Sequence, residues 1–86
     1  MYNIFKYRKR QRMIQCRFTN CSNDKMIHHI NQVGKLNIPG INHSAMFVPA
    51  NDLHHTMVTS HVKDVVESDK TIVVKTENSI YVFEKL

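Results

Sequence analysis

The C-terminal stretch, residues 56–86, constrains the fold more than any other part of the chain. It holds three runs rich in β-branched and aromatic residues, separated by short polar breaks at Ser68-Asp69 and Glu77-Asn78. Breaks of this length favour tight hairpin turns. The sequence therefore predicts a three-stranded antiparallel meander at the C-terminus.

The second break also predicts the register of the last hairpin. With Glu77 and Asn78 at the centre of a two-residue turn, large side chains share one face and valines the other. We expect Asn78 or its neighbour to have a positive φ, as the usual hairpin turns require. The predicted cross-strand pairs are Ile72 with Phe83, Val73 with Val82, and Val74 with Tyr81.

Two further features concern the middle of the chain. The run from His54 to Val66 is long for a strand in a small domain, so we expect a bend or bulge near Thr59-Ser60. A strand is also predicted over His43–Val48, ended by Pro49, and Pro39-Gly40 before it is a strong turn signal.

Near the N-terminus, apolar and polar residues alternate with a period of two. Ile14, Cys16 and Phe18 are separated by Gln15 and Arg17. This pattern predicts a half-buried strand.

Residues 23–33 show the only helical periodicity. Ser22-Asn23-Asp24 is a helix-start cluster, and Gly34 stands where a C-terminal cap is expected. The spacing predicts an α-helix with Met26, Ile27, Ile30 and Val33 on its buried face and His28, His29, Asn31 and Gln32 on its solvent face.

These elements predict an α+β fold: a small curved antiparallel β-sheet or open barrel with one packed α-helix and a C-terminal β-meander. We expect two parts, a basic N-terminal arm over residues 1–12 and a single small domain over residues 13–86. The predicted core comprises Ile14, Phe18, Met26, Ile27, Ile30, Val33, Val58, Val62, Ile72, Val74, Val82 and Phe83.

The formal net charge of +5 is distributed very unevenly. Residues 1–35 carry eight Lys or Arg and one acid (+7), whereas residues 36–86 carry four against six acids (−2). Five cations fall within seven positions: Lys6, Arg8, Lys9, Arg10 and Arg12. Without residues 1–12 the formal charge is zero, so the arm accounts for the whole excess.

The basic arm is the strongest functional signal. Its cations, flanked by Phe5 and Tyr7, suit phosphate contacts with aromatic faces available for bases. We therefore expect a nucleic-acid-binding protein whose site residues are Lys6, Arg8, Lys9, Arg10, Arg12 and Arg17. An acidic protein partner or a merely solvated tail would explain the same charges, and Met13 offers a second translation start that would omit the arm.

No catalytic or cofactor signature is recognisable. There is no glycine-rich phosphate loop, GxSxG motif or paired zinc-ligand spacing among the six His and two Cys. We expect no enzyme activity, no cofactor and no metal, with Cys16 an inert buried thiol and Cys21 more exposed. With two cysteines and no apolar run long enough to span a bilayer, a cytoplasmic protein that does not enter membranes is expected.

A pattern in the C-terminal half resembles small uncharacterised proteins encoded by phages and their relatives. It consists of Thr59-Ser60-x-Val62 and Thr76-x-Asn78-Ser79-x-Tyr81, and covers under a third of the chain. The resemblance implies a small accessory protein acting on host or phage machinery, with no catalytic residues to carry over. The alternative function is thus binding and modulation of a host protein through the sheet surface, and an edge strand would also allow a homodimer.

Overall fold

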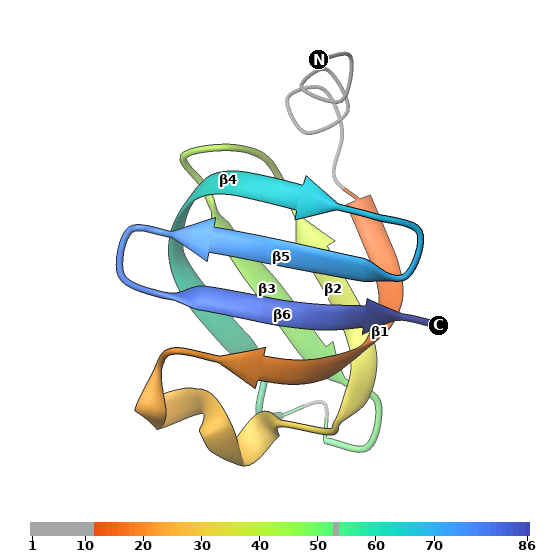
Figure 1. Cartoon of the computed structure of the whole chain (residues 1–86). Helices are drawn as coiled ribbons and strands as arrows, with labels where there is room; N and C mark the ends of the chain where they lie inside the picture. The colour runs from red at the N-terminus through yellow and green to blue at the C-terminus, as the bar shows by residue number, and fades with distance from the viewer. Residues whose placement is uncertain (1–11, 53) are drawn as a thin grey trace.

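The described part of the chain forms six antiparallel strands, each hydrogen-bonded to the next, and the last pairs with the first to close a barrel (Figure 1). The computed structural model describes residues 12–52 and 54–86. The elements are β1 (Arg12–Cys21), the 3₁₀ helix η1 (Asp24–His29), β2 (Val33–Ile38), β3 (Ser44–Pro49), β4 (Met57–Glu67), β5 (Thr71–Thr76) and β6 (Ile80–Lys85).

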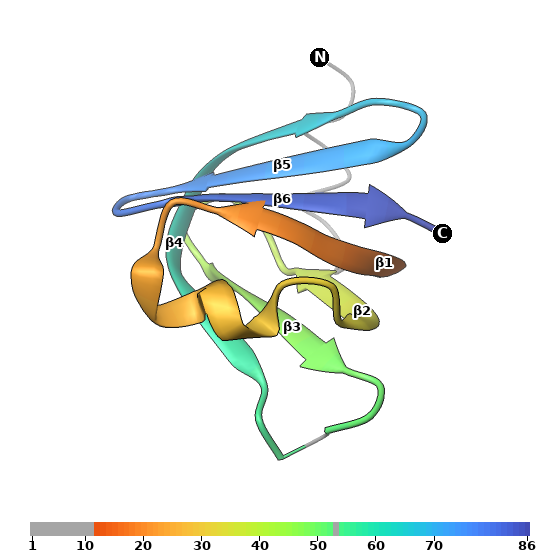
Figure 2. The same cartoon turned by 60° about the horizontal axis from the view of Figure 1, so that its bottom comes forward.

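Two strands pass from one side of the barrel to the other. β1 pairs with β2 through residues 12–17 and with β6 through residues 16–21. β4 pairs with β3 through residues 57–61 and with β5 through residues 62–67. The first sheet thus contains β2, β3 and the first halves of β1 and β4. The second sheet contains β5, β6 and the second halves of β1 and β4. Figure 2 shows β4 curving from beside β3 to beside β5.

Bulges permit these bends. Thr59 and Ser60 together lie opposite Ala45, so β4 carries one extra residue at the predicted position. The Ala45 N–H donates a hydrogen bond to the Thr59 hydroxyl at 3.0 Å, so a side-chain oxygen takes the place of a backbone acceptor at the bulge. β1 carries a similar extra residue at Thr19, whose hydroxyl donates to the Val82 carbonyl at 3.0 Å.

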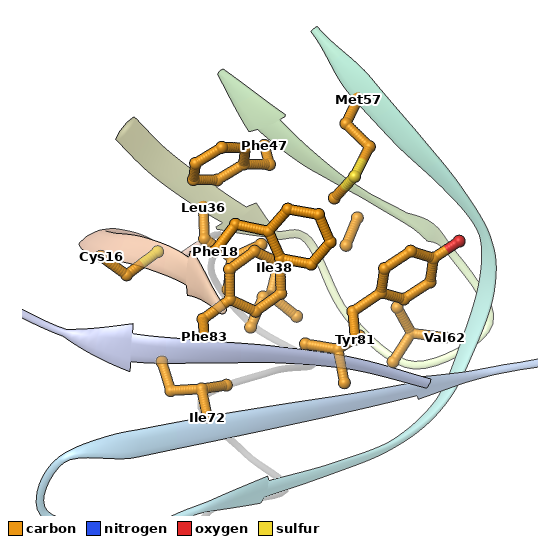
Figure 3. Close-up of a cluster of buried hydrophobic side chains, with 12 residues drawn as sticks. Cys16, Phe18, Leu36, Ile38, Phe47, Met57, Val62, Ile72, Tyr81 and Phe83 are labelled. Atoms are coloured by element: carbon orange, nitrogen blue, oxygen red, sulfur yellow. The ribbon is translucent and has the colours of Figure 1, made fainter. Parts of the chain in front are cut away.

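Aromatic side chains fill the space between the sheets (Figure 3). The Phe18 ring lies 5.1 Å from that of Phe83, 6.0 Å from that of Phe47 and 6.2 Å from that of Tyr81, between centroids. Such packed rings contribute beyond the area that they bury. The complete buried hydrophobic set is Cys16, Phe18, Leu36, Ile38, Ala45, Phe47, Met57, Val62, Ile72, Val74, Tyr81 and Phe83.

The predicted C-terminal meander and its register are confirmed. Ile72 pairs with Phe83, Val73 with Val82 and Val74 with Tyr81. The predicted positive φ is wrong, since among the described non-glycine residues only Asn31 and Asn42 have one.

The turn between β5 and β6 is closed by a side chain instead. The Thr76 N–H donates to the Ser79 carbonyl at 2.8 Å, and the Thr76 hydroxyl accepts from the Ser79 N–H at 3.1 Å. The Ser60 hydroxyl donates to the Thr76 hydroxyl at 2.8 Å, which joins the turn to the β4 bulge. Because a hydroxyl takes the place of a backbone acceptor, Glu77 and Asn78 need no left-handed conformation.

The predicted α+β class is wrong: the described residues form strands and no α-helix, with the 3₁₀ helix η1 as their one helical element. The predicted helix start is correct, since Asn23 caps η1 by accepting from the Lys25 N–H at 2.9 Å. The helix then ends after six residues, and its bonds are of the i to i+3 type, such as Ile30 N–H to the Ile27 carbonyl at 3.1 Å.

Competition from the sheet explains why this segment is not an α-helix. Phe18 donates to the Gln32 carbonyl at 3.0 Å and accepts from the Asn31 N–H at 2.6 Å, so β1 takes the groups that a longer helix would use. Asn31 reverses the chain with φ of 79°. Gly34, predicted as a helix cap, lies within β2 between Cys16 of β1 and Pro49 of β3.

The shorter period also changes which side chains are buried. His29, predicted to face solvent, is 6% exposed, whereas Ile27 is 52% and Val33 37% exposed. Of the other predicted core residues, Phe18, Val62, Ile72, Val74 and Phe83 are buried, Ile14, Met26, Ile30 and Val82 are half-buried, and Val58 is exposed. Leu36 and Ile38 were missing from the prediction because no strand was expected at β2.

Candidate nucleic-acid interface

The six predicted site residues lie at or before β1. Lys6, Arg8, Lys9 and Arg10 fall outside the described residues, as do Phe5 and Tyr7. Arg12 is the first residue of β1 and its backbone lies opposite Ile38. Arg17, in the middle of the same strand, forms an ion pair with Glu84 at 3.5 Å, and both side chains are about half exposed.

The strand that begins at Arg12 contributes to a mixed polar and apolar outer surface. Gln15 of β1, Lys35 of β2 and Val48 of β3 form one row across the first sheet. Met13 and Met46 flank Asn37 in the neighbouring row. The side chains of both rows alternate with the buried residues of their strands, so all six lie on the outside of the barrel.

A groove of about 320 Å³ lies on this surface. We call it the β1–β3 groove; it is lined by Met13, Gln15, Val33, Gly34, Lys35, Val48 and Ala50. Most of this lining is apolar, Gln15 supplies an amide, and Lys35 is the one charged residue that the described part of the chain contributes. The groove therefore suits a ligand that combines an apolar face with a negative charge or hydrogen-bonding edge.

Two cations on the second sheet are engaged with acids. Lys63 lies 3.7 Å from Glu77, and Lys85 forms an ion pair with Glu67. Residues 12–86 carry eight Lys or Arg against seven acids, whereas residues 1–11 carry four and no acid. The positive charge of the chain is therefore concentrated before the barrel.

The aromatic residues of the barrel are not available for base stacking. Phe18, Phe47, Tyr81 and Phe83, the four within the described residues, are all buried. Any stacking on a Phe or Tyr ring would have to use residues of the N-terminal segment.

The histidines do not gather into a site. Among residues 12–52 and 54–86, no three His, Cys, Asp or Glu side chains are arranged to hold a metal ion. His55 Nδ1 lies 2.6 Å from an Asp52 carboxylate oxygen on the surface. Buried His29 pairs through Nδ1 with Gln32 Oε1 at 2.8 Å, and its ring centroid is 4.1 Å from that of His28.

The two cysteines are free and differ in environment. Burial raises the pKa of Cys16 from 9.0 to about 12, and a backbone hydrogen bond at Leu36 offsets this only in part. This agrees with the predicted inert thiol. Cys21 is half-buried, and its thiol donates to the Asn23 carbonyl at 3.3 Å.

Sequence reasoning missed the groove although a signal was present. Leu36 and Ile38 alternate with Lys35 and Asn37, which is a strand pattern. The helical interpretation of residues 23–33 assigned Gly34 to a cap and left the next residues without an element. The row that joins Gln15 to Lys35 follows only from the observed register.

Within the described residues, no helix is long and apolar enough to cross a membrane. No protein-family model matches the chain, and neither the curated proteins nor the solved structures include a significant match.

Proposed function

We propose that this protein is a non-catalytic binding protein that engages nucleic acid through its basic N-terminal arm, residues 1–12. The observation that carries the proposal is the distribution of charge. Residues 1–11 carry four cations and no acid, while residues 12–86 differ by one between cations and acids. Clustered cations produce a local positive potential that attracts phosphates, whereas cations that are scattered or paired with acids do not produce such a potential.

Ion pairs on the barrel strengthen this assignment. Arg17, Lys63 and Lys85 each lie beside a carboxylate, so part of their charge is neutralised locally. Backbone recognition by such an arm predicts little base specificity. A cytoplasmic location, which the two free cysteines favour, belongs to the same proposal.

A salt titration with charge-matched variants tests the proposal. The arm variant combines Arg8→Gln, Lys9→Gln and Arg10→Gln. The barrel variant combines Lys25→Gln, Lys70→Gln and Lys75→Gln, which are exposed and lower the net charge by the same amount. Binding to generic DNA and RNA is measured by fluorescence anisotropy at several salt concentrations.

The arm variant should lose about tenfold or more in affinity, and the slope of log K against log salt should fall by about 3 units, one for each lost phosphate contact. The barrel variant should bind nearly as the unmodified chain does. Equal losses in both variants would reject a local site, and no binding at low salt would reject nucleic acid as the ligand.

A second candidate function is protein binding through the second sheet. Val66, Val73 and Val82 form a row across β4, β5 and β6 on its outer surface. Val66 is 50% and nearby Ile80 44% exposed. Such a patch, with the resemblance to phage-encoded accessory proteins, favours a protein partner or a second copy of the chain. Loss of partner capture or self-association in Val66→Asp, but not in the arm variant, would support this candidate.

A further inference from the structure

We infer that the β1–β3 groove accepts one unstacked base, so that the ligand is single-stranded rather than duplex nucleic acid. This inference rests on the proposed function and concerns the surface next to the arm. It adds a second contact region that sequence reasoning did not include.

The basic arm and the β1–β3 groove are continuous along β1. The arm ends at Arg12, and the next residue, Met13, already lines the groove. At about 3.3 Å per residue, Gln15 lies only about 10 Å beyond Arg12. A polynucleotide held by phosphate contacts to the arm is therefore within reach of the groove without any change in the barrel.

The side chains that line the groove have the chemistry to contact both the face and the edge of a base. Met13, Val33 and Val48 offer aliphatic surface for the faces of a base. Gln15 and Lys35 are a cross-strand pair in the same groove. An amide can donate to and accept from a base edge, and an ammonium group can donate to a carbonyl oxygen or a phosphate.

Charge selects between ligand classes at this surface. Among the described residues, the lining contains one cation and no acidic residue. A basic peptide would meet Lys35 without a compensating carboxylate, whereas an anionic strand places negative charge beside it. Nucleic acid therefore fits the groove better than a basic protein segment does.

The size of the groove suits a small ligand. The volume of about 320 Å³ lies at the small end of the range of about 300–1,000 Å³ found for ligand pockets. A paired and stacked base in a duplex presents only its groove edge and would not enter. Flipping it out costs a few kcal/mol, roughly, and a single strand largely avoids this cost.

The test uses the full chain and three labelled probes of about twelve nucleotides: oligo(dT), oligo(U) and a hairpin duplex. Lys35→Gln removes the charge of the groove, and Ala50→Asp adds a carboxylate at an exposed position in its lining. The matched controls are Lys75→Gln on β5 and Ser68→Asp, both exposed and remote from the groove in the sheet order. Circular dichroism verifies that each variant is folded.

We expect at least one single-stranded probe to bind about tenfold more tightly than the duplex. Each groove variant should weaken that binding by about threefold or more and leave duplex binding unchanged, while the controls bind as the unmodified chain does. Equal affinity for single strand and duplex, or groove variants that bind normally, would overturn this inference. If the arm variant still loses affinity in that case, the proposed function stands without it, whereas absence of any binding rejects both.

Discussion

Replacing Gly34 with alanine should strongly destabilise the barrel, because β2 and β3 approach closely at this residue. A Cβ built on Gly34 would lie 2.2 Å from the Val48 carbonyl oxygen and 2.8 Å from Pro49 Cα. Both are backbone atoms of the neighbouring strand, so a change of rotamer cannot relieve the contact. Ordinary contact begins at 3.4 Å, so the two strands would have to separate locally by roughly 1.2 Å.

The expected magnitude follows from this geometry. Overpacking a well-packed interior typically costs about 1–3 kcal/mol, and a clash with the backbone of the neighbouring strand, which no rotamer change relieves, belongs at the upper end. A loss of about 3 kcal/mol is a large part of the roughly 5–15 kcal/mol that stabilises a domain. With a urea m-value of about 1.5 kcal/mol/M, the midpoint of unfolding should fall by about 2 M.

Urea unfolding monitored by circular dichroism measures this change. Lys35→Ala is the matched control, since the adjacent side chain is exposed and its removal should shift stability by about 0.5 kcal/mol or less. A Gly34→Ala chain with an unchanged midpoint and m-value would refute the close approach of β2 and β3 at this position.

Three further outcomes are expected. Burial raises the pKa of Cys16 from 9.0 to about 12, so Cys21 should be alkylated at pH 8 in the native state and Cys16 only on unfolding. Because the folded state holds the Cys16 proton more tightly than the unfolded state, the contribution of this group to stability is full below pH 9 and declines between pH 9 and 12, which unfolding measured at several pH values will show. His29→Asp should lower the free energy of unfolding by about 2 kcal/mol or more in urea titrations, whereas Ile27→Asp at a half-exposed position should change it little. A larger loss in the Ile27 variant than in the His29 variant would instead support the amphipathic α-helix that the sequence predicts. Thr76→Val should cost about 1–3 kcal/mol, because the three hydrogen bonds of the Thr76 hydroxyl are lost. A thermal midpoint equal to that of the unmodified chain would contradict the hydroxyl-closed turn.

The sequence by itself determined the local β structure. Period-two alternation around Cys16, the C-terminal hairpin register and the bulge at Thr59-Ser60 were all predictable, because each depends on residues close together in the chain. The basic arm could be proposed as a site from the sequence, because a run of cations is visible there and its charge does not depend on the fold; as a site it stays a prediction.

Tertiary structure alone decided the class of fold and the surface next to the arm. Residues 23–33 have helical spacing, yet Phe18 of β1 binds the backbone of Asn31 and Gln32, and β2 begins at Val33. Pairing of β6 with β1 closes the barrel, and the pairing of Gln15 with Lys35 assembles the groove. These contacts join residues far apart in the chain, and their free energy comes from burial and backbone pairing between strands, which local periodicity does not encode.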